Sequence, residues 1–268
     1  MMSLTCVVNR LSKSYKKGKT IHVIYSVEDC SLEYIREILC GVSDPSKELE
    51  PLSHEVEEKA TSLWFNKNLN DFQKEAVMHC LKSKEIAVIH GPPGTGKTTT
   101  LVELLVKTAH LFPTVKILCC APSNIAVDNI AEKLIESDAK VNVVRIGHPA
   151  RLLESVQNRS LDALVQKADA TEIVQDSKKD LHKVLKDLCK ERDKSKRYEL
   201  IAERNQLKKD VRQFEKKAVT EIFTTAQIIL CTTTMAGCSK LWKFCQDRPG
   251  KTLDMVVIDE CAQATEPS

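Results

Sequence analysis

Residues 86–98 read Ile-Ala-Val-Ile-His-Gly-Pro-Pro-Gly-Thr-Gly-Lys-Thr, and this stretch governs how the rest of the chain is interpreted. Its apolar start, residues 86–90, is typical of a buried strand, and residues 97–111 have the apolar spacing of a helix that ends before Pro113. The turn between them fits the pattern G-x-x-x-x-G-K-[S/T] in the strand-then-helix context that a phosphate-binding loop requires. The sequence therefore predicts a nucleoside-triphosphate site.

The residue types of this loop explain the chemistry expected of it. Glycines let backbone N–H groups turn toward phosphate oxygens, and the N-terminus of the following helix adds partial positive charge. Lys97 is expected to reach the β- and γ-phosphates of ATP, and the Thr98 hydroxyl is expected to ligate Mg²⁺. The loop residues predicted to bind nucleotide are Gly91, Pro92, Pro93, Gly94, Thr95, Gly96, Lys97 and Thr98.

A second chemical signal is Met-Val-Val-Ile-Asp-Glu at residues 255–260, where an apolar strand ends in two carboxylates. Ligands of α/β sheets bind at the carboxyl ends of the strands. Asp259 is therefore expected to hold Mg²⁺ through water, and Glu260 to orient and deprotonate the attacking water. Adjacent carboxylates can also form a solvated turn, but together with a phosphate loop they complete a metal–phosphate site.

Two glutamines give weaker signals. Gln263 lies three residues after Glu260 and could contact the γ-phosphate or its water. Gln73 lies 18 residues before Gly91 and could pair with the adenine edge. An isolated Gln on a helix is more often a solvated surface residue, so both assignments are hypotheses.

Short polar side chains also follow two other apolar runs that are predicted to be strands. They are Ser123 and Asn124 after one run, and Thr232 and Thr233 at the end of the other. Hydroxyl and amide groups beside free backbone N–H groups suit the phosphate oxygens of a nucleic-acid strand that crosses the sheet edge. Ordinary helix N-caps and turns use the same residue types, so a purely structural role stays open.

Composition divides the chain into three zones. Residues 1–67 are mixed, with a strand expected at 21–25 and a helix at 32–39. Residues 68–150 and 221–268 alternate apolar strands with helices, which predicts an α/β domain with a parallel sheet covered on both faces.

The third zone, residues 151–220, interrupts this domain. It contains no Gly and no Pro, and it holds 18 Lys and Arg and 13 Asp and Glu, with apolar residues at helical spacing. A single helix of that length would run roughly 100 Å at ~1.5 Å per residue, which does not suit a compact protein. The pattern therefore predicts an inserted antiparallel helical hairpin with its turn near 194–198.

The overall composition limits the function classes. The 268 residues include 40 Lys and Arg and 37 Asp and Glu, a net charge of +3, so any nucleic-acid contact must come from local patches. Eleven cysteines without a CxxC motif disfavour a disulfide scaffold, and no apolar run approaches the roughly 20 residues that span a bilayer. We expect a soluble monomer of the cytoplasm or nucleus, with no membrane partner.

Five phrases of the sequence together resemble a known family. They are residues 70–77 (NDFQKEAV), 90–100 (HGPPGTGKTTT), 118–129 (LCCAPSNIAVDN), 145–157 (RIGHPARLLESVQ) and 256–264 (VVIDECAQA). The resemblance is to the Upf1-like branch of superfamily 1 helicases and covers about residues 68–268, whereas residues 1–52 match poorly. It implies a RecA-like P-loop motor domain whose hairpin is a stalk supporting an accessory barrel. It also implies an ATP-driven 5′-to-3′ translocase on single-stranded DNA or RNA.

The resemblance implies roles for individual residues by matched position. It assigns adenine recognition to Gln73 and γ-phosphate sensing to Gln263. It assigns metal binding and water activation to Asp259 and Glu260. Residues 94–99, which add Thr99 to the loop, contact phosphates. The positions implied to contact the nucleic-acid backbone are Ser123, Asn124, Thr232 and Thr233.

The resemblance also leads us to expect an incomplete domain. In the family, a second RecA-like domain and its arginines complete the ATP site, and Ser268 comes eight residues after Glu260, before those parts. We therefore expect a truncated helicase fragment that binds ATP and single strands and turns over little ATP by itself. Two alternatives stay open: a binding module without catalysis, and a structural P-loop ATPase with a coiled-coil hinge.

Overall fold

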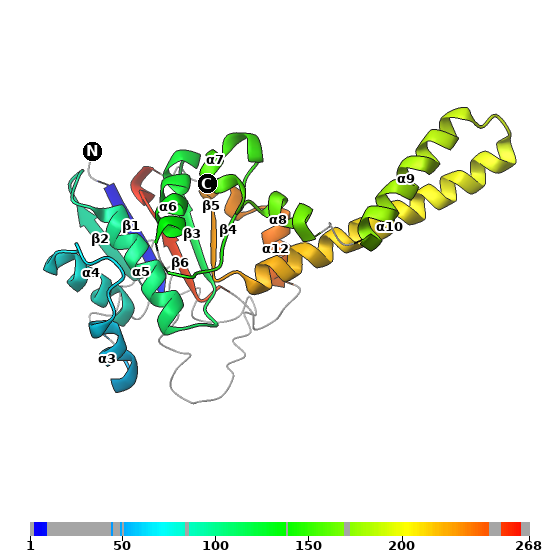
Figure 1. Cartoon of the computed structure of the whole chain (residues 1–268). Helices are drawn as coiled ribbons and strands as arrows, with labels where there is room; N and C mark the ends of the chain where they lie inside the picture. Colours follow the sequence, from blue (N-terminus) through cyan, green and yellow to red (C-terminus); the bar gives the residue numbers. More distant parts are fainter. Residues whose placement is uncertain are drawn as a thin grey trace.

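Figure 1 shows the computed structural model, in which a layered α/β body carries a long projecting pair of helices. The structure describes residues 3–9, 44, 49, 51–83, 86–137, 139–168, 172–246 and 253–263. The strand expected at 21–25 and the helix expected at 32–39 lie outside the described residues.

One sheet forms the centre of the body. Its strands are arranged in the order β2-β1-β6-β3-β5-β4, and the last four of these pair in parallel. The strands are β1 (Ser3–Asn9), β2 (Ile86–Gly91), β3 (Ile117–Ala121), β4 (Val143–Arg145), β5 (Ile228–Thr232) and β6 (Met255–Ile258). The predicted α/β class with a RecA-like parallel sheet is confirmed.

Strand β1 is the antiparallel member of the described sheet, and the sequence pattern does not predict it. Ser3 lies opposite Gly91 of β2, and Cys6 lies opposite Ile258 of β6, so β1 joins the phosphate-loop strand to the acidic strand. Neighbouring strands are about 4.8 Å apart, which places β2 and β6 roughly 10 Å from each other. The two chemical motifs therefore lie at the same sheet edge, on either side of one strand.

Helices cover both faces of the sheet (Figure 1). Strand β3 shows why, because Ile117 and Cys119 pack into one hydrophobic core while Leu118 and Cys120 pack into another on the opposite face. The helices of the body are α3 (His54–Ser62), α4 (Asp71–Lys82), α5 (Lys97–Leu111), α6 (Asn124–Glu136), η1 (Pro149–Arg151), α7 (Glu154–Gln157), α8 (Leu161–Ala168), α11 (Thr233–Ala236), α12 (Ser239–Gln246) and η2 (Cys261–Gln263). Among the described helices, none combines the length and apolar character needed to cross a bilayer.

The inserted pair consists of α9 (Glu172–Lys190) and α10 (Lys194–Thr225), which we call the stalk (Figure 1). Its turn lies at residues 191–193, before the predicted position at 194–198. Asp193 sets this boundary, because its carboxylate caps α10 by accepting a hydrogen bond of 2.8 Å from the Ser195 N–H. Helix α10 also continues beyond the predicted end of the insertion, and Phe223 in its last turn is fully buried in the body.

Candidate nucleotide and nucleic-acid site

The phosphate loop connects β2 to α5, and its glycines make it tight. Gly94 has φ +82° and Gly96 has φ +80°, both in the left-handed region that other residues rarely adopt. A Cβ atom on Gly96 would lie 2.5 Å from the Gln73 amide nitrogen, and one on Gly91 would lie 2.8 Å from the Thr95 hydroxyl oxygen. The loop is thus compact, and it leads directly into α5. The first N–H groups of that helix have no acceptor within the helix and are available for phosphate oxygens.

Lys97, the first residue of α5, extends its ammonium group across the loop. Its Nζ donates hydrogen bonds to the carbonyl oxygens of Gly91 (2.8 Å) and Pro92 (2.7 Å). The Thr95 hydroxyl donates to the same Pro92 oxygen at 2.8 Å. Lys97 thus lies inside the loop that the sequence predicts to bind phosphates, and Thr98 follows it on the first turn of the helix.

Gln73 lies against the phosphate loop. Asn70 and Gln73 form a reciprocal capping box at the start of α4, with hydrogen bonds of 3.0 and 2.9 Å. The Gln73 Nε2 group also donates to the Thr95 carbonyl oxygen at 3.1 Å. The structure therefore brings Gln73 to the edge of the nucleotide site, and its contact with adenine stays a prediction.

A buried lysine anchors the segment before α4 on the phosphate-loop helix. Lys107 of α5 donates to the carbonyl oxygens of Ala60 and Leu63, and its Nζ lies 3.4 Å from the centre of the Trp64 ring. Burial lowers the pKa of Lys107 to about 8. The negative charge of Glu103 acts in the opposite direction and raises this pKa, but its effect is smaller. Lys107 thus ties the end of α3 and the residues that follow it to the phosphate-loop helix.

The acidic pair ends β6 in a strained turn. Asp259 is 5% exposed, and its N–H donates to the Cys120 carbonyl oxygen at 2.8 Å. Glu260 has φ +50°, the one positive φ of a non-glycine residue in the described ranges, and its N–H donates to an Asp259 carboxylate oxygen at 3.1 Å. Strain of this kind clusters at functional sites. The turn leaves Asp259 buried and Glu260 half-buried, so the two carboxylates have different surroundings.

Two further residues surround the acidic pair. Gln263 has an exposed side chain, and its N–H donates to the Glu260 carbonyl oxygen at 2.8 Å, which closes the short helix η2. On the core side, burial raises the pKa of the Cys119 thiol, and the Asp259 charge adds to that shift. Cys119 therefore stays a neutral thiol behind the acidic pair.

The oxygen ligands at this edge fit Mg²⁺. Thr98 supplies a hydroxyl and Asp259 a carboxylate, and Mg²⁺ combines few such protein ligands with substrate phosphates and water. Within the described ranges, no group of three or more His, Cys, Asp or Glu side chains could hold a metal ion. The donor set thus suits a metal bound together with a nucleotide.

Ser123 and Thr232 act as helix N-caps at the ends of β3 and β5. The Ser123 hydroxyl accepts a hydrogen bond from the Ala126 N–H at 3.1 Å, and the Thr232 hydroxyl accepts one from the Met235 N–H at 3.3 Å. The structural role is thus confirmed for both residues, while each hydroxyl keeps a hydrogen that it can donate. Ser123 is exposed and Thr233 is half-buried, whereas Thr232 is only 8% exposed. Ser123 and Thr233 are therefore the more accessible donors.

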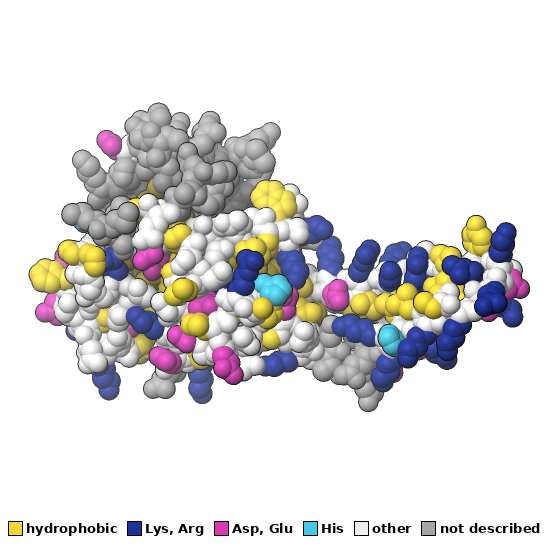
Figure 2. All heavy atoms as spheres, turned by 90° about the horizontal axis from the view of Figure 1, so that it is seen from above, with side chains coloured by type: hydrophobic (Ala, Val, Ile, Leu, Met, Phe, Trp, Pro, Cys, Tyr) yellow, Lys and Arg dark blue, Asp and Glu magenta, His cyan; other side chains and the backbone are white. Residues whose placement is uncertain are grey.

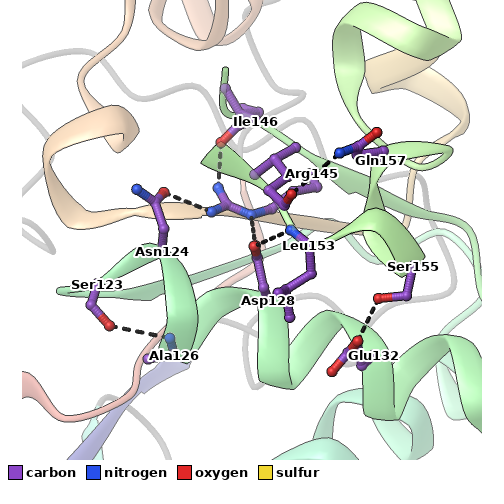
Figure 3. Close-up of polar contacts among 11 residues, drawn as sticks. Ser123, Asn124, Ala126, Asp128, Glu132, Arg145, Ile146, Leu153, Ser155 and Gln157 are labelled. Atoms are coloured by element: carbon purple, nitrogen blue, oxygen red, sulfur yellow. Dashed lines mark hydrogen bonds and ion pairs between the residues drawn. The ribbon is translucent and has the colours of Figure 1, made fainter. Parts of the chain in front are cut away.

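Arg145 orients Asn124 at the start of α6 (Figure 3). Arg145 is fully buried, and its Nε pairs with an Asp128 carboxylate oxygen at 2.8 Å, while its Nη2 donates to Asn124 Oδ1 at 2.9 Å. A guanidinium only donates hydrogen bonds, so Asn124 must turn its oxygen toward Arg145 and its NH₂ group away. Figure 3 shows this nitrogen directed away from Arg145. Asn124 therefore presents N–H donors at the sheet edge.

Asp128 connects the same network to the first turns of the insertion. Its second carboxylate oxygen accepts a hydrogen bond from the Leu153 N–H at 3.0 Å (Figure 3). The sequence pattern assigns no role to Asp128 or Arg145, although they lie in the matched phrases at residues 118–129 and 145–157. The available signal was a charge inside the apolar run at residues 143–146, because a buried charge requires a partner.

Comparisons with known proteins agree with this geometry. Residues 68–268 match the family described as AAA domain. The chain is 43% identical over 234 residues to DNA-binding protein SMUBP-2 of Mus musculus, a match that covers 87% of this chain and 22% of that protein. It is 39% identical over 204 residues to DNA polymerase alpha-associated DNA helicase A of Schizosaccharomyces pombe, covering 76% of this chain and 29% of that protein.

An archaeal protein is also similar. An uncharacterized ATP-dependent helicase of Methanocaldococcus jannaschii is 32% identical over 267 residues, a match that covers 86% of this chain and 38% of that protein. The chain therefore spans about a fifth to two fifths of the length of these three relatives.

Proposed function

The chain belongs to the Upf1-like superfamily 1 helicases, and from this premise we propose that it is the ATP-binding motor domain of an ATP-dependent 5′-to-3′ helicase acting on single-stranded DNA or RNA. The observation that carries the proposal is the shared sheet edge. The phosphate loop, the acidic pair and the Asn124 NH₂ group lie at the ends of β2, β6 and β3 in one sheet. ATP and a nucleic-acid strand would therefore bind to one continuous edge.

The phosphate loop and the residues around it would bind ATP. The Lys97 ammonium would exchange its two carbonyl acceptors in the loop for β- and γ-phosphate oxygens, which form stronger charge-assisted hydrogen bonds. Gln73, which already contacts the loop through Thr95, would direct its amide to the adenine edge. Thr98 and Asp259 would hold Mg²⁺, which when bound supplies positive charge against the phosphates.

Glu260 and Gln263 would act on the γ-phosphate side. The Glu260 carboxylate would orient a water molecule and accept its proton as the water oxygen attacks the γ-phosphorus and the bond to ADP breaks. Gln263 lies one short turn later and would hydrogen-bond to the γ-phosphate or to that water. Loss of this contact after hydrolysis would then change the position of η2.

We propose that a second RecA-like domain completes the ATP site, as in the family that the chain resembles. An arginine supplied by a partner domain typically accelerates phosphoryl transfer by ~10³ to 10⁵. Arg145, the arginine at the described sheet edge, cannot take this role because it is fully buried and paired with Asp128. Hydrolysis would therefore depend on closure of two domains over the nucleotide.

The test is ATP hydrolysis by residues 1–268, with and without the second RecA-like domain and with and without single-stranded oligonucleotide. We expect little turnover by residues 1–268, and turnover stimulated by the strand once the second domain is present. Strong hydrolysis by residues 1–268 would contradict the two-domain site. Nucleotide binding without any turnover in the longer protein would instead support the binding module without catalysis.

A further inference from the structure

A groove lies at the base of the stalk, between the stalk and the body. Helices α8, α9, α10 and α12 form it, together with the start of η1, and it encloses about 780 Å³. We call it the stalk-base groove. Its size is within the range of roughly 300–1,000 Å³ that is typical of ligand sites. The nucleotide and sheet-edge contacts described above use none of its lining residues.

Among the charged residues that line the stalk-base groove, cations outnumber acids. Lysine and arginine side chains contribute five of its lining residues, against two acidic ones, Asp162 and Glu215. Lys240 lies 3.3 Å from Asp162 and so neutralises one of the two acids. The five basic residues are Lys178, Arg212, Lys216, Lys240 and Lys243.

Arg212 lines the groove from helix α10 of the stalk, and Lys243 lines it from α12. Both side chains are exposed, and neither forms an ion pair within the described ranges. Glu215 is the acid of the lining that Lys240 does not pair with, and the lining cations outnumber it, so the groove keeps a net positive charge. Clefts lined by one sign of charge concentrate ligands of the opposite sign.

Apolar side chains also line the groove. Val165, Val219 and Phe244 contribute to its lining. Phe244 is only 6% exposed because it also packs into the hydrophobic core that contains Leu118 and Cys120. A ligand that fits has an apolar or aromatic part beside an anionic part. Single-stranded nucleic acid has both, in its bases and its phosphates.

The fold places this groove at the end of the proposed strand path. The strand order β3-β5-β4 puts Ser123 first, Thr233 next, and then His148, which follows β4 and lines the groove. Helix α12, on the other wall, follows α11 directly after β5. Figure 2 shows Lys and Arg side chains gathered where the stalk joins the body and along both sides of the stalk, with hydrophobic side chains between them.

We propose that the stalk-base groove binds single-stranded nucleic acid where the strand leaves the sheet edge, with phosphates on Arg212 and Lys243 and bases or sugars on the apolar lining. This proposal rests on the proposed function, because it takes the strand to cross the ends of β3 and β5. It adds a contact beyond that edge, which only a strand long enough to span both places can make.

The test measures binding of fluorescein-labelled oligo(dT) to residues 1–268 by anisotropy, with strands of about 12 and about four nucleotides. The groove variant, Arg212→Ala with Lys243→Ala, removes two cations that line the groove. The control variant, Lys208→Ala with Lys209→Ala, removes two exposed stalk cations that do not line it. Both variants change the net charge equally and replace only exposed side chains.

We expect the groove variant to bind the longer strand roughly tenfold more weakly, and to bind the shorter strand as the wild type does. Each lost phosphate contact lowers the slope of log K against log salt by about 0.7 for single strands, so the slope should fall by about 1.4. The control variant should stay within about twofold of the wild type for both strands.

Each other result has a defined meaning. Unchanged binding of the longer strand by the groove variant, or an equal loss in the control variant, would overturn the groove site and leave the sheet-edge contacts standing. Weaker binding of a fluorescent ATP analogue by the groove variant would make the groove a mononucleotide site and overturn the proposal. A wild-type chain that binds neither strand would overturn both the groove and the nucleic-acid part of the proposed function.

Discussion

The sheet edge and the stalk present charged groups in opposite ways. At the sheet edge the core fixes each group, since Arg145 is fully buried, Asp128 is 1% exposed and Asp259 is 5% exposed. In the stalk, helix α10 has 32 residues, of which Val211 and Phe223 are buried. A buried charge held in one position by specific partners cannot be replaced without loss, whereas exposed charges act together and each contributes little. Matched substitutions in the two regions test this difference.

Glu260→Gln is expected to have the largest effect on hydrolysis. The amide keeps the shape of the side chain but cannot accept the proton of the attacking water, so kcat should fall by ~10² to 10⁴. The measurement is strand-stimulated ATP hydrolysis in the protein that includes the second RecA-like domain. The same substitution at Glu199, which is exposed on α10, should leave kcat unchanged. A Glu260→Gln rate close to the wild-type rate would assign the general base to another residue.

Asp128→Ala is expected to have the largest effect on stability. It leaves the fully buried Arg145 guanidinium without its ion-pair partner, and such a loss costs about 3–5 kcal/mol. Urea unfolding of residues 1–268 measures the change in the free energy of unfolding. The matched stalk variant Asp187→Ala removes an exposed carboxylate and should change it by less than about 0.5 kcal/mol. Equal losses in the two variants would remove the distinction between the regions.

Lys97→Ala should weaken nucleotide binding by one to two decades. Charge-assisted hydrogen bonds of the kind Lys97 would make to phosphates contribute about 1.5–3 kcal/mol each, and each 1.4 kcal/mol is roughly tenfold in affinity. Titration with a fluorescent ATP analogue measures the loss. Lys209→Ala on the stalk removes the same charge and should bind the analogue as the wild type does. An unchanged affinity in Lys97→Ala would contradict the assignment of the phosphate loop.

The sequence predicts those parts of the fold whose signals are local. Residues 97–111 and 255–258 coincide with α5 and β6, because a glycine-rich turn and a proline bound the first and an acidic pair ends the second. The stalk turn lies a few residues before its predicted position, since the residues on both sides of Asp193 are charged and include no Gly or Pro that would mark the turn. Strand β1 was not predicted, because it pairs with residues about 80 and 250 positions away.

The candidate site divides in the same way. The phosphate loop and the acidic pair carry their chemistry in consecutive residues, so the sequence predicts them directly. The contact of Gln73 with Thr95 joins residues 22 apart, and the pairing of Arg145 with Asp128 joins residues 17 apart. Such contacts form only when helices pack on the sheet, so no pattern of neighbouring residues predicts them. The sequence therefore predicts the reacting groups better than the groups that position them.

The smallest expected effect is a pH dependence of stability that comes from Lys107. Burial lowers its pKa from the ordinary 10.5 to about 8 in the folded chain, so between these values the unfolded chain binds more protons. Stability should therefore rise as the pH increases through this window, and the Lys107 contribution should be lost as the pH falls through 8. We expect a change on the order of 1 kcal/mol, because hydrogen bonds to two carbonyl oxygens and the Glu103 charge stabilise the ammonium form.

Lys107→Met removes this titrating group, so the measurement is the free energy of unfolding of wild type and variant from about pH 7 to about pH 10.5. Cys119 has the opposite effect at high pH, since burial raises its pKa and the unfolded chain loses that proton first. The difference between the two proteins, rather than either slope, therefore isolates Lys107. Lys183→Met on the exposed face of α9 is the matched stalk control and should keep the wild-type slope. If Lys107→Met also keeps that slope, the buried lysine titrates like an exposed one, and the contrast between the body and the stalk does not extend to protonation.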